Sequence, residues 1–139
     1  MNNDDIQQYV INGDAFMETG RFQEALQEYN KAISLNPNDP ETYLNKASIL
    51  RILERHEEAL QAVNESISLN SNDPDAYIIK GNILSLLSRD EEAITEYHNA
   101  QCANLHNDDA NHQRIIHDIL SKYIQDISAL EITQNITMI

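Results

Sequence analysis

The sequence predicts an all-α protein: an α-α superhelix (solenoid) of three 34-residue helix-turn-helix repeats followed by a C-terminal capping helix. The first observation is a fixed period. The stretch Asn36-Pro37-Asn38-Asp39-Pro40 returns 34 residues later as Asn70-Ser71-Asn72-Asp73-Pro74. A period of this size is typical of stacked repeats rather than of a single globular core. The second observation is that apolar residues recur three and four apart, the helical spacing, while no stretch carries a strand signal.

The first repeat is expected at about residues 6–39, with helices at about 4–18 and 22–35. Tyr9, Gly13 and Phe16 are spaced by four and three residues, so they share one face of the first helix. Gly20-Arg21 separates the two helices. Asn36-Pro37 ends the second, because the residue before a proline is disfavoured in the helical conformation.

The second and third repeats are expected at about residues 40–73 and 74–107. Each opens with Asp-Pro, in which the aspartate suits the N-cap and the proline suits the first helical position. The segments 54–56 and 88–90 are predicted as turns, and the glutamate pairs that follow them, at 57–58 and 91–92, open the second helices.

After residue 107 the period stops. Asp109 is expected to cap a longer helix to about residue 131, whose apolar stripe suits the capping of the last repeat. Residues 132–139 are predicted to form a flexible tail, and residues 1–131 a single domain.

Three positions of each first helix and three of each second helix are occupied by residues of the same kind. They are Tyr9, Gly13, Phe16, Ala25, Tyr29 and Ala32; Tyr43, Ala47, Leu50, Ala59, Val63 and Ser66; Tyr77, Gly81, Leu84, Ala93, Tyr97 and Ala100. This pattern over residues 6–107 resembles the tetratricopeptide repeat. Two departures are Pro37, which has no equivalent at Ser71 or Leu105, and the polar residues Asn12, Lys46 and Lys80 where the family has leucine.

The resemblance implies a concave groove that is lined by the first helix of each repeat and binds a peptide or a helix. Carried onto this sequence, the groove positions are Val10, Ile11, Asp14, Met17, Leu44, Asn45, Ser48, Arg51, Ile52, Ile78, Ile79, Asn82, Ser85 and Leu86. Apolar residues are common among them, whereas a solvated face should be mostly polar. We therefore expect an apolar or amphipathic partner, with basic flanks, whose backbone hydrogen bonds to asparagines. The alternative is that part of this face is core or is covered by the capping helix.

Members of this family that grip the acidic C-terminal tails of heat-shock chaperones do so with a clamp of Lys, Asn, Asn, Lys and Arg. The matching positions here are Val10, Asp14, Asn45, Asp75 and Ile79, of which only Asn45 fits. Two of the five are acidic and would repel a carboxylate. An acidic chaperone tail is therefore not the expected partner.

The formal net charge of −14, from 23 acidic and 9 basic residues, excludes the function classes that need clustered Lys and Arg, namely nucleic-acid binding and docking on anionic membranes. Cys102 is the only cysteine, so no disulfide forms within the chain.

No apolar run is long enough for a membrane span, and the N-terminus does not resemble a secretory signal. The sequence predicts a soluble, cytoplasmic protein.

No catalytic motif is present, so the sequence predicts neither an enzyme nor a cofactor site. His98, His106, His112 and His117 lie close together in sequence, near Cys102, but their spacing does not place two on one helical face. We interpret them as surface residues and expect no metal. A non-catalytic protein-protein interaction module, a scaffold or adaptor, is therefore the main hypothesis. The alternative is self-association into a homo-oligomer through the C-terminal helix and tail.

Overall fold

A computed structural model describes residues 3–104 and 110–137, and within these ranges the chain is helical with no strand. The seven helices are α1 (Asn3–Glu18), α2 (Phe22–Leu35), α3 (Pro40–Ile52), α4 (His56–Leu69), α5 (Pro74–Leu86), α6 (Asp90–Asn104) and α7 (Ala110–Thr137). The prediction of an all-α solenoid is confirmed. The helix starts after the two inner turns lie one residue earlier than expected, at His56 and Asp90.

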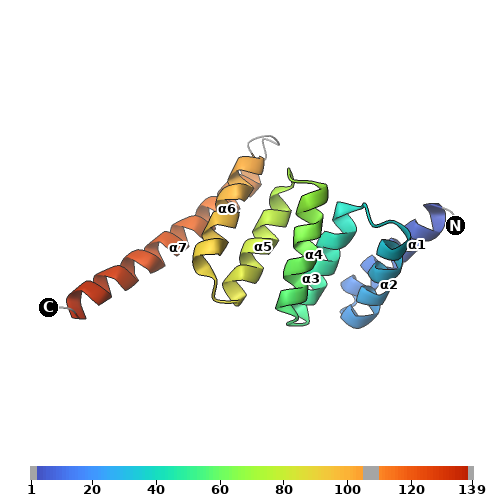
Figure 1. Ribbon diagram of the computed structural model, residues 1–139, viewed down its shortest axis with the longest axis horizontal. Coiled ribbons are helices and arrows are strands. Elements are labelled where there is room, and N and C mark those ends of the chain that lie inside the picture. Colours follow the sequence, from blue (N-terminus) through green and yellow to red (C-terminus); the bar gives the residue numbers. More distant parts are fainter. Residues whose placement is uncertain (1–2, 105–109, 138–139) are drawn as a thin grey trace.

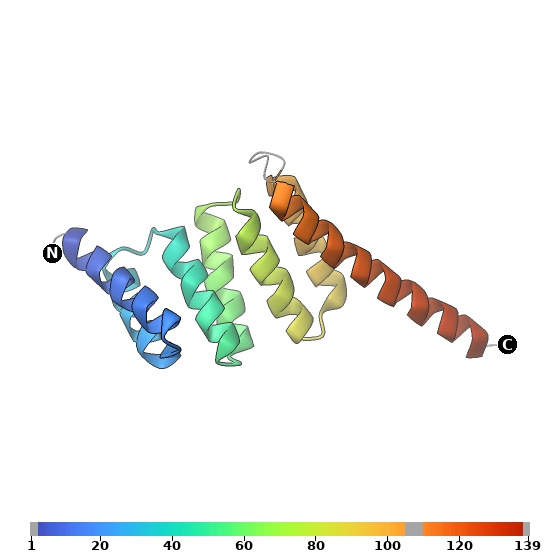
Figure 2. The ribbon, with the colours of Figure 1, turned by 180° about the vertical axis from the view of Figure 1, so that it is seen from behind.

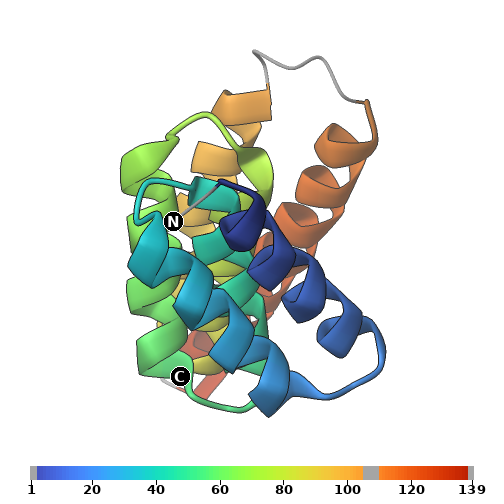
Figure 3. The same cartoon turned by 90° about the vertical axis from the view of Figure 1, so that its right-hand side faces the viewer.

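The helices form three hairpins that stack side by side, with α7 against the last one (Figure 1). The first helices of the hairpins, α1, α3 and α5, lie on one face together with α7 (Figure 2). An end view separates this face from that of α2 and α4 (Figure 3). The helices that carry the predicted groove residues, α1, α3 and α5, lie on this face, which is therefore the candidate binding face.

The period seen in the sequence reappears as the same helix-capping hydrogen bond at the start of the second and of the third hairpin. Asp39 accepts a hydrogen bond from the Glu41 backbone N–H at 3.1 Å, and Asp73 accepts one from the Asp75 N–H at 3.0 Å. Each aspartate therefore caps the helix that its proline begins, as predicted. These caps fix the N-terminal ends of α3 and α5 at the same edge of the stack.

Close packing within the hairpins explains the glycines inside α1 and α5. A Cβ atom on Gly13 would lie 2.6 Å from Tyr29 Cε1, and one on Gly81 would lie 2.5 Å from Tyr97 Cε1. Both tyrosines are buried. In the second hairpin the same two positions hold Ala47 and Val63, so a larger residue on one helix faces a smaller one on the other.

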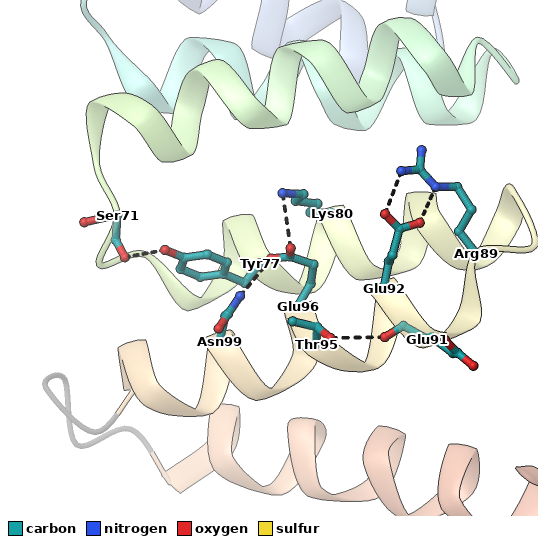
Figure 4. A network of polar contacts seen from close by, with 9 residues as sticks. All are labelled: Ser71, Tyr77, Lys80, Arg89, Glu91, Glu92, Thr95, Glu96 and Asn99. Atoms are coloured by element: carbon teal, nitrogen blue, oxygen red, sulfur yellow. Dashed lines mark hydrogen bonds and ion pairs between the residues drawn. The ribbon is translucent and has the colours of Figure 1, made fainter.

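Lys80, at a position where the family has leucine, joins a network of polar contacts between α5 and α6 (Figure 4). Its Nζ lies 3.2 Å from Glu96 Oε1, and both side chains are largely covered. Glu96 also accepts a hydrogen bond from Asn99, while Tyr77 donates one to the Ser71 carbonyl at 2.8 Å. The ion pair accommodates a lysine at the edge of the interface between the two helices.

The final helix packs on α6 through Ile116 and Leu120, which are buried beside Tyr97. Tyr97 and Tyr123 bring their ring centroids to 5.7 Å. The expected end at about residue 131 is wrong, because α7 continues to Thr137 through most of the segment predicted to be a flexible tail. The sequence 110–137 contains no glycine or proline that would stop a helix. The single domain at residues 1–131 stays a prediction.

Candidate functional site

On the face of α1, α3, α5 and α7, a hollow of about 590 Å³ lies between α3 and α5. We call it the α3–α5 hollow. It brings together five of the predicted groove residues from two repeats. Its lining consists of Asp39, Pro40, Glu41, Leu44, Asn45, Ser48, Asn70, Asp73, Asp75, Ile78 and Ile79.

The charge of the α3–α5 hollow is one-sided. Four carboxylates, those of Asp39, Glu41, Asp73 and Asp75, line it, and no basic side chain does. They lie at the N-terminal ends of α3 and α5, as is common for acidic residues in the first turn of a helix. Leu44, Ile78 and Ile79 supply the apolar part of the wall. This hollow combines apolar surface with a negative potential at one edge.

A second hollow, of about 530 Å³, lies next to α1 and adds apolar lining from Ile6, Val10 and Ile11. It shares Asp39 with the α3–α5 hollow, so the two meet at the start of α3. Ile11 is 57% exposed, a high value for a large apolar side chain. Apolar surface is therefore available to a partner across the first two repeats.

A third hollow, of about 330 Å³, lies between α3, α5 and α7, and we call it the α3–α5–α7 hollow. Its lining consists of Arg51, Asn82, Ser85, Leu86, Tyr97, Ile119, Lys122 and Tyr123. In contrast to the α3–α5 hollow, it has two basic side chains and no carboxylate in its lining.

Tyrosine hydroxyls from α2 and α6, the second helices of their hairpins, form hydrogen bonds with polar residues predicted to line the groove. Tyr29 donates a hydrogen bond to Asp14, and Tyr97 donates one to Asn82 Oδ1 at 2.7 Å. Burial raises the pKa of both hydroxyls, so they remain protonated donors at neutral pH. In the second repeat Val63 has no hydroxyl, and the equivalent groove residue Ser48 donates to the Leu44 carbonyl instead.

The structure brings most of the predicted groove residues into the three hollows. Leu44 is only 9% exposed, however, and Met17 packs against the core, so both contribute mainly to packing. Asp14, Met17 and Ile52 line none of the three hollows. Their assignment, like that of the whole groove to ligand binding, stays a prediction.

Sequence reasoning missed the carboxylate edge and the contribution of α7. Asp39 and Asp73 were assigned only to helix capping, although the repetition of Asp-Pro at each repeat boundary was a usable signal. Lys122 and Tyr123 come from the helix that breaks the period, so no repeat position pointed to them.

Clusters of metal ligands and membrane-spanning helices are both absent from the residues that the structure describes. His98, Cys102 and His117 are exposed, and no three His, Cys, Asp or Glu side chains in the described part of the chain are placed to share a metal ion. His106 and the side chain of His112 lie outside the described residues. None of the described helices is both long and apolar enough to cross a membrane.

Comparisons with known proteins agree with this architecture. Residues 13–50 match the TPR repeat family and residues 40–73 match the Tetratricopeptide repeat family. The TPR2B domain of yeast Sti1, solved in complex with pHsp70, is similar with a TM-score of 0.84 and 21% identity, covering 89% of this chain and 99% of that one. No curated protein matches the chain by sequence.

Two further solved structures resemble the chain closely in fold. The first TPR of Spaghetti (RPAP3), bound to the HSP90 peptide SRMEEVD, has a TM-score of 0.80 and 21% identity, covering 92% of this chain and 97% of that one. The Yersinia enterocolitica type III secretion translocator chaperone SycD, in an alternative dimer, has a TM-score of 0.80 and 13% identity, with coverages of 94% and 96%. At these identities the likeness concerns the fold.

Proposed function

The chain is a tetratricopeptide repeat protein, and from that premise we propose that it is a non-catalytic protein-interaction module, a scaffold or adaptor. Its partner is an apolar or amphipathic segment with basic residues, bound in the α3–α5 hollow and the adjoining hollow at α1. The observation that carries this proposal is the lining of the α3–α5 hollow, with Ile78 and Ile79 beside four carboxylates.

The charge of the hollow favours a basic partner. An approaching lysine or arginine is attracted by the carboxylates of Asp39, Glu41, Asp73 and Asp75, and the net charge of −14 extends this attraction over a longer range. Asn45 and Ser48 line the same hollow further along α3 and can hydrogen bond to the partner's backbone. The apolar side chains then supply the desolvated contacts on which affinity depends.

An acidic chaperone tail fits this lining less well. Spaghetti and yeast Sti1 are bound to chaperone peptides in their solved structures, and the Spaghetti peptide SRMEEVD carries three acidic residues. In this chain Asp75, one of the positions matching the clamp, lies in the hollow beside Asp39, Glu41 and Asp73. Like-charge repulsion opposes the entry of a carboxylate at this edge.

Selection from a phage library of random 12-residue peptides tests the proposal. We expect the enriched peptides to carry apolar residues together with Lys or Arg. The double variant Glu41→Lys/Asp75→Lys is expected to bind them at least about tenfold more weakly, because it reverses the charge of the edge. Fluorescence anisotropy with a synthetic copy of a selected peptide measures the difference.

A matched control is Glu57→Lys/Glu91→Lys. These exposed glutamates also lie in the first turns of helices, α4 and α6, but line none of the three hollows. Equal affinity of the selected peptides for both double variants would refute the groove as the binding site. Circular dichroism checks that both double variants stay helical. If Glu41→Lys/Asp75→Lys loses helicity, the milder variant Glu41→Gln/Asp75→Asn takes its place.

Self-association is the second candidate function, and a specific feature of α7 favours it. Ile124 is 57% exposed and Leu130 is 64% exposed in the C-terminal half of α7. The C-terminal end of this helix extends past the stack (Figure 1). Over residues 113–130 the helix carries two basic and two acidic residues, so two copies would not repel each other there. The similar chaperone SycD was solved as a dimer.

A further inference from the structure

The α3–α5–α7 hollow has two basic side chains in its lining and no carboxylate to balance them, although the protein as a whole is acidic. Arg51, in the last turn of α3, and Lys122, on α7, both line it, and no Asp or Glu does. Ser85 places the hollow at the C-terminal end of α5, whereas Asp75 places the carboxylate edge at the N-terminal end of the same helix. The two regions of opposite charge are therefore about 15 Å apart, at a rise of about 1.5 Å per residue.

The two bases are not neutralised by the protein. Five of the other seven basic residues form ion pairs with glutamates, whereas Arg51 and Lys122, like Lys46 and Arg114, form none in the described part of the chain. Arg51 Nε is shielded from solvent and has no hydrogen-bond acceptor among the described residues. A shielded donor without an acceptor costs free energy, which a bound acceptor would recover.

Tyrosine hydroxyls occupy the acceptor atoms of the hollow and leave its donors available. Tyr97 donates to Asn82 Oδ1 at 2.7 Å, so the Asn82 amide group retains its N–H donors for a ligand. Tyr123 donates to Ser85 Oγ, so the Ser85 hydroxyl hydrogen can also point to a ligand. Together with Arg51 and Lys122, the hollow presents four side chains that donate hydrogen bonds.

From this set of donors we infer that the α3–α5–α7 hollow is a binding subsite for a carboxylate of the peptide partner. Charged donors form their strongest hydrogen bonds with carboxylates, and an arginine can do so with two N–H groups. None of the five positions that match the chaperone-tail clamp lies in this hollow. The inference rests on the proposed function and extends it, because it gives the partner a second charge of opposite sign.

The partner is therefore a segment with two different ends. Its basic residue lies at the carboxylate edge of the α3–α5 hollow, its apolar residues contact Ile78 and Ile79, and its acidic residue reaches Arg51 and Lys122. A distance of about 15 Å corresponds to about five residues of extended chain or about ten residues of helix. A 12-residue peptide is long enough for either conformation.

The test repeats the phage selection on the wild-type protein, on Arg51→Gln/Lys122→Gln and on Arg114→Gln. Arg114 is exposed on the same helix, α7, but lines none of the three hollows, so Arg114→Gln is the matched control. We expect Asp or Glu to be enriched, at a fixed spacing from Lys or Arg, on the wild-type protein and on Arg114→Gln. The double variant is expected to select basic apolar peptides without that acidic residue.

A peptide from this selection is then used to measure the coupling free energy between its acidic residue and the two bases, Arg51 and Lys122. Replacing its Glu by Gln is expected to weaken binding to the wild-type protein at least about tenfold and to leave binding to the double variant unchanged. If circular dichroism shows that the double variant is misfolded, Lys122→Gln alone carries the test, since the Lys122 side chain is exposed.

The two proposals fail in distinguishable ways. Enrichment of basic apolar peptides without any preference for Asp or Glu on all three proteins would overturn the carboxylate subsite and leave the proposed function in place. A peptide set whose binding is insensitive to Glu41→Lys/Asp75→Lys, or no enrichment at all, would overturn both.

Discussion

At the residue scale, complementary sizes across each hairpin determine how closely its two helices approach. Gly13 faces Tyr29 and Gly81 faces Tyr97, whereas Ala47 and Val63 hold these positions in the second hairpin. Glycine disfavours a helix by about 1 kcal/mol relative to alanine, so these glycines require a packing reason. The tyrosine rings, which would lie less than 3 Å from an added Cβ, provide it.

The first prediction at this scale is that Gly81→Ala lowers the free energy of unfolding by about 1–2 kcal/mol. The overlap with Tyr97 costs about 1–3 kcal/mol, and the better helix propensity of alanine recovers up to about 1 kcal/mol. In a Tyr97→Val background, which imitates the second hairpin, the cost of Gly81→Ala should disappear. Urea unfolding of the four proteins measures this coupling.

Tyr97→Phe provides the control, because it removes the hydroxyl that bonds to Asn82 but keeps the ring. Gly81→Ala should cost as much in this background as in the wild-type protein. An equal cost in the Val and Phe backgrounds would contradict the explanation by ring contact.

At the scale of elements, each hairpin turns through one residue with a left-handed backbone at the same repeat position. These residues are Gly20, Glu54 and Ser88, with φ of 77°, 60° and 59°. The arginine that follows each of them forms an ion pair with the glutamate three residues on. The turns are therefore alike in conformation, although only the first has the residue that this conformation favours.

We predict that Glu54→Gly raises the free energy of unfolding by about 0.5 kcal/mol. A residue other than glycine pays roughly 1–2 kcal/mol for a left-handed backbone in the folded state, and Glu54→Gly removes this cost. The greater conformational freedom of glycine in the unfolded chain offsets about 0.4–1 kcal/mol of the gain. The reverse change, Gly20→Ala, should lower the free energy of unfolding by about 0.5 kcal/mol, from the same two opposing contributions. A Cβ atom on Gly20 meets no other atom within 4 Å, so that effect would be one of backbone conformation alone.

Thermal and urea unfolding of both variants measure these changes. A loss of stability in Glu54→Gly would show that the glutamate side chain contributes more to the turn than its backbone conformation costs.

At the scale of the whole molecule, α7 has two parts with different surroundings. Its first part covers the third hairpin through Ile116 and Leu120, as a cap on a repeat stack should. Its C-terminal end extends past the stack, and Ile124, Ile127 and Leu130 in its C-terminal half are exposed. The helix thus completes the core at one end and presents apolar surface at the other.

If this surface mediates self-association, sedimentation across a hundredfold concentration range will show a mass that rises with concentration. The association should strengthen with salt, because the charge of −14 on each copy is then screened. Ile124→Asp/Leu130→Asp should restore a monomer and leave peptide binding unchanged, whereas Ile11→Asp, at an equally exposed isoleucine in the α1 hollow, should not affect the mass. A constant monomer mass for the wild-type protein would refute the second candidate function.

The sequence by itself determined the repeat architecture, because its determinants are local. Asp-Pro at each boundary, helical spacing of the apolar residues and matched small and aromatic positions each act within one hairpin or between neighbours, and all were readable as a period of 34 residues. The same period located most of the residues that line the hollows.

Only the tertiary structure decided what those residues form together. The carboxylates of Asp39 and Asp73 share one edge because successive first helices start at the same side of the stack. Arg51, Asn82, Ser85 and Lys122 meet because α7, which packs on α6, reaches α5 at Tyr123. Since α7 does not follow the period, neither its length nor its contribution to the groove could be inferred by analogy between repeats. Contacts across repeats depend on how helices are placed in space, and spacing along the chain does not specify that placement.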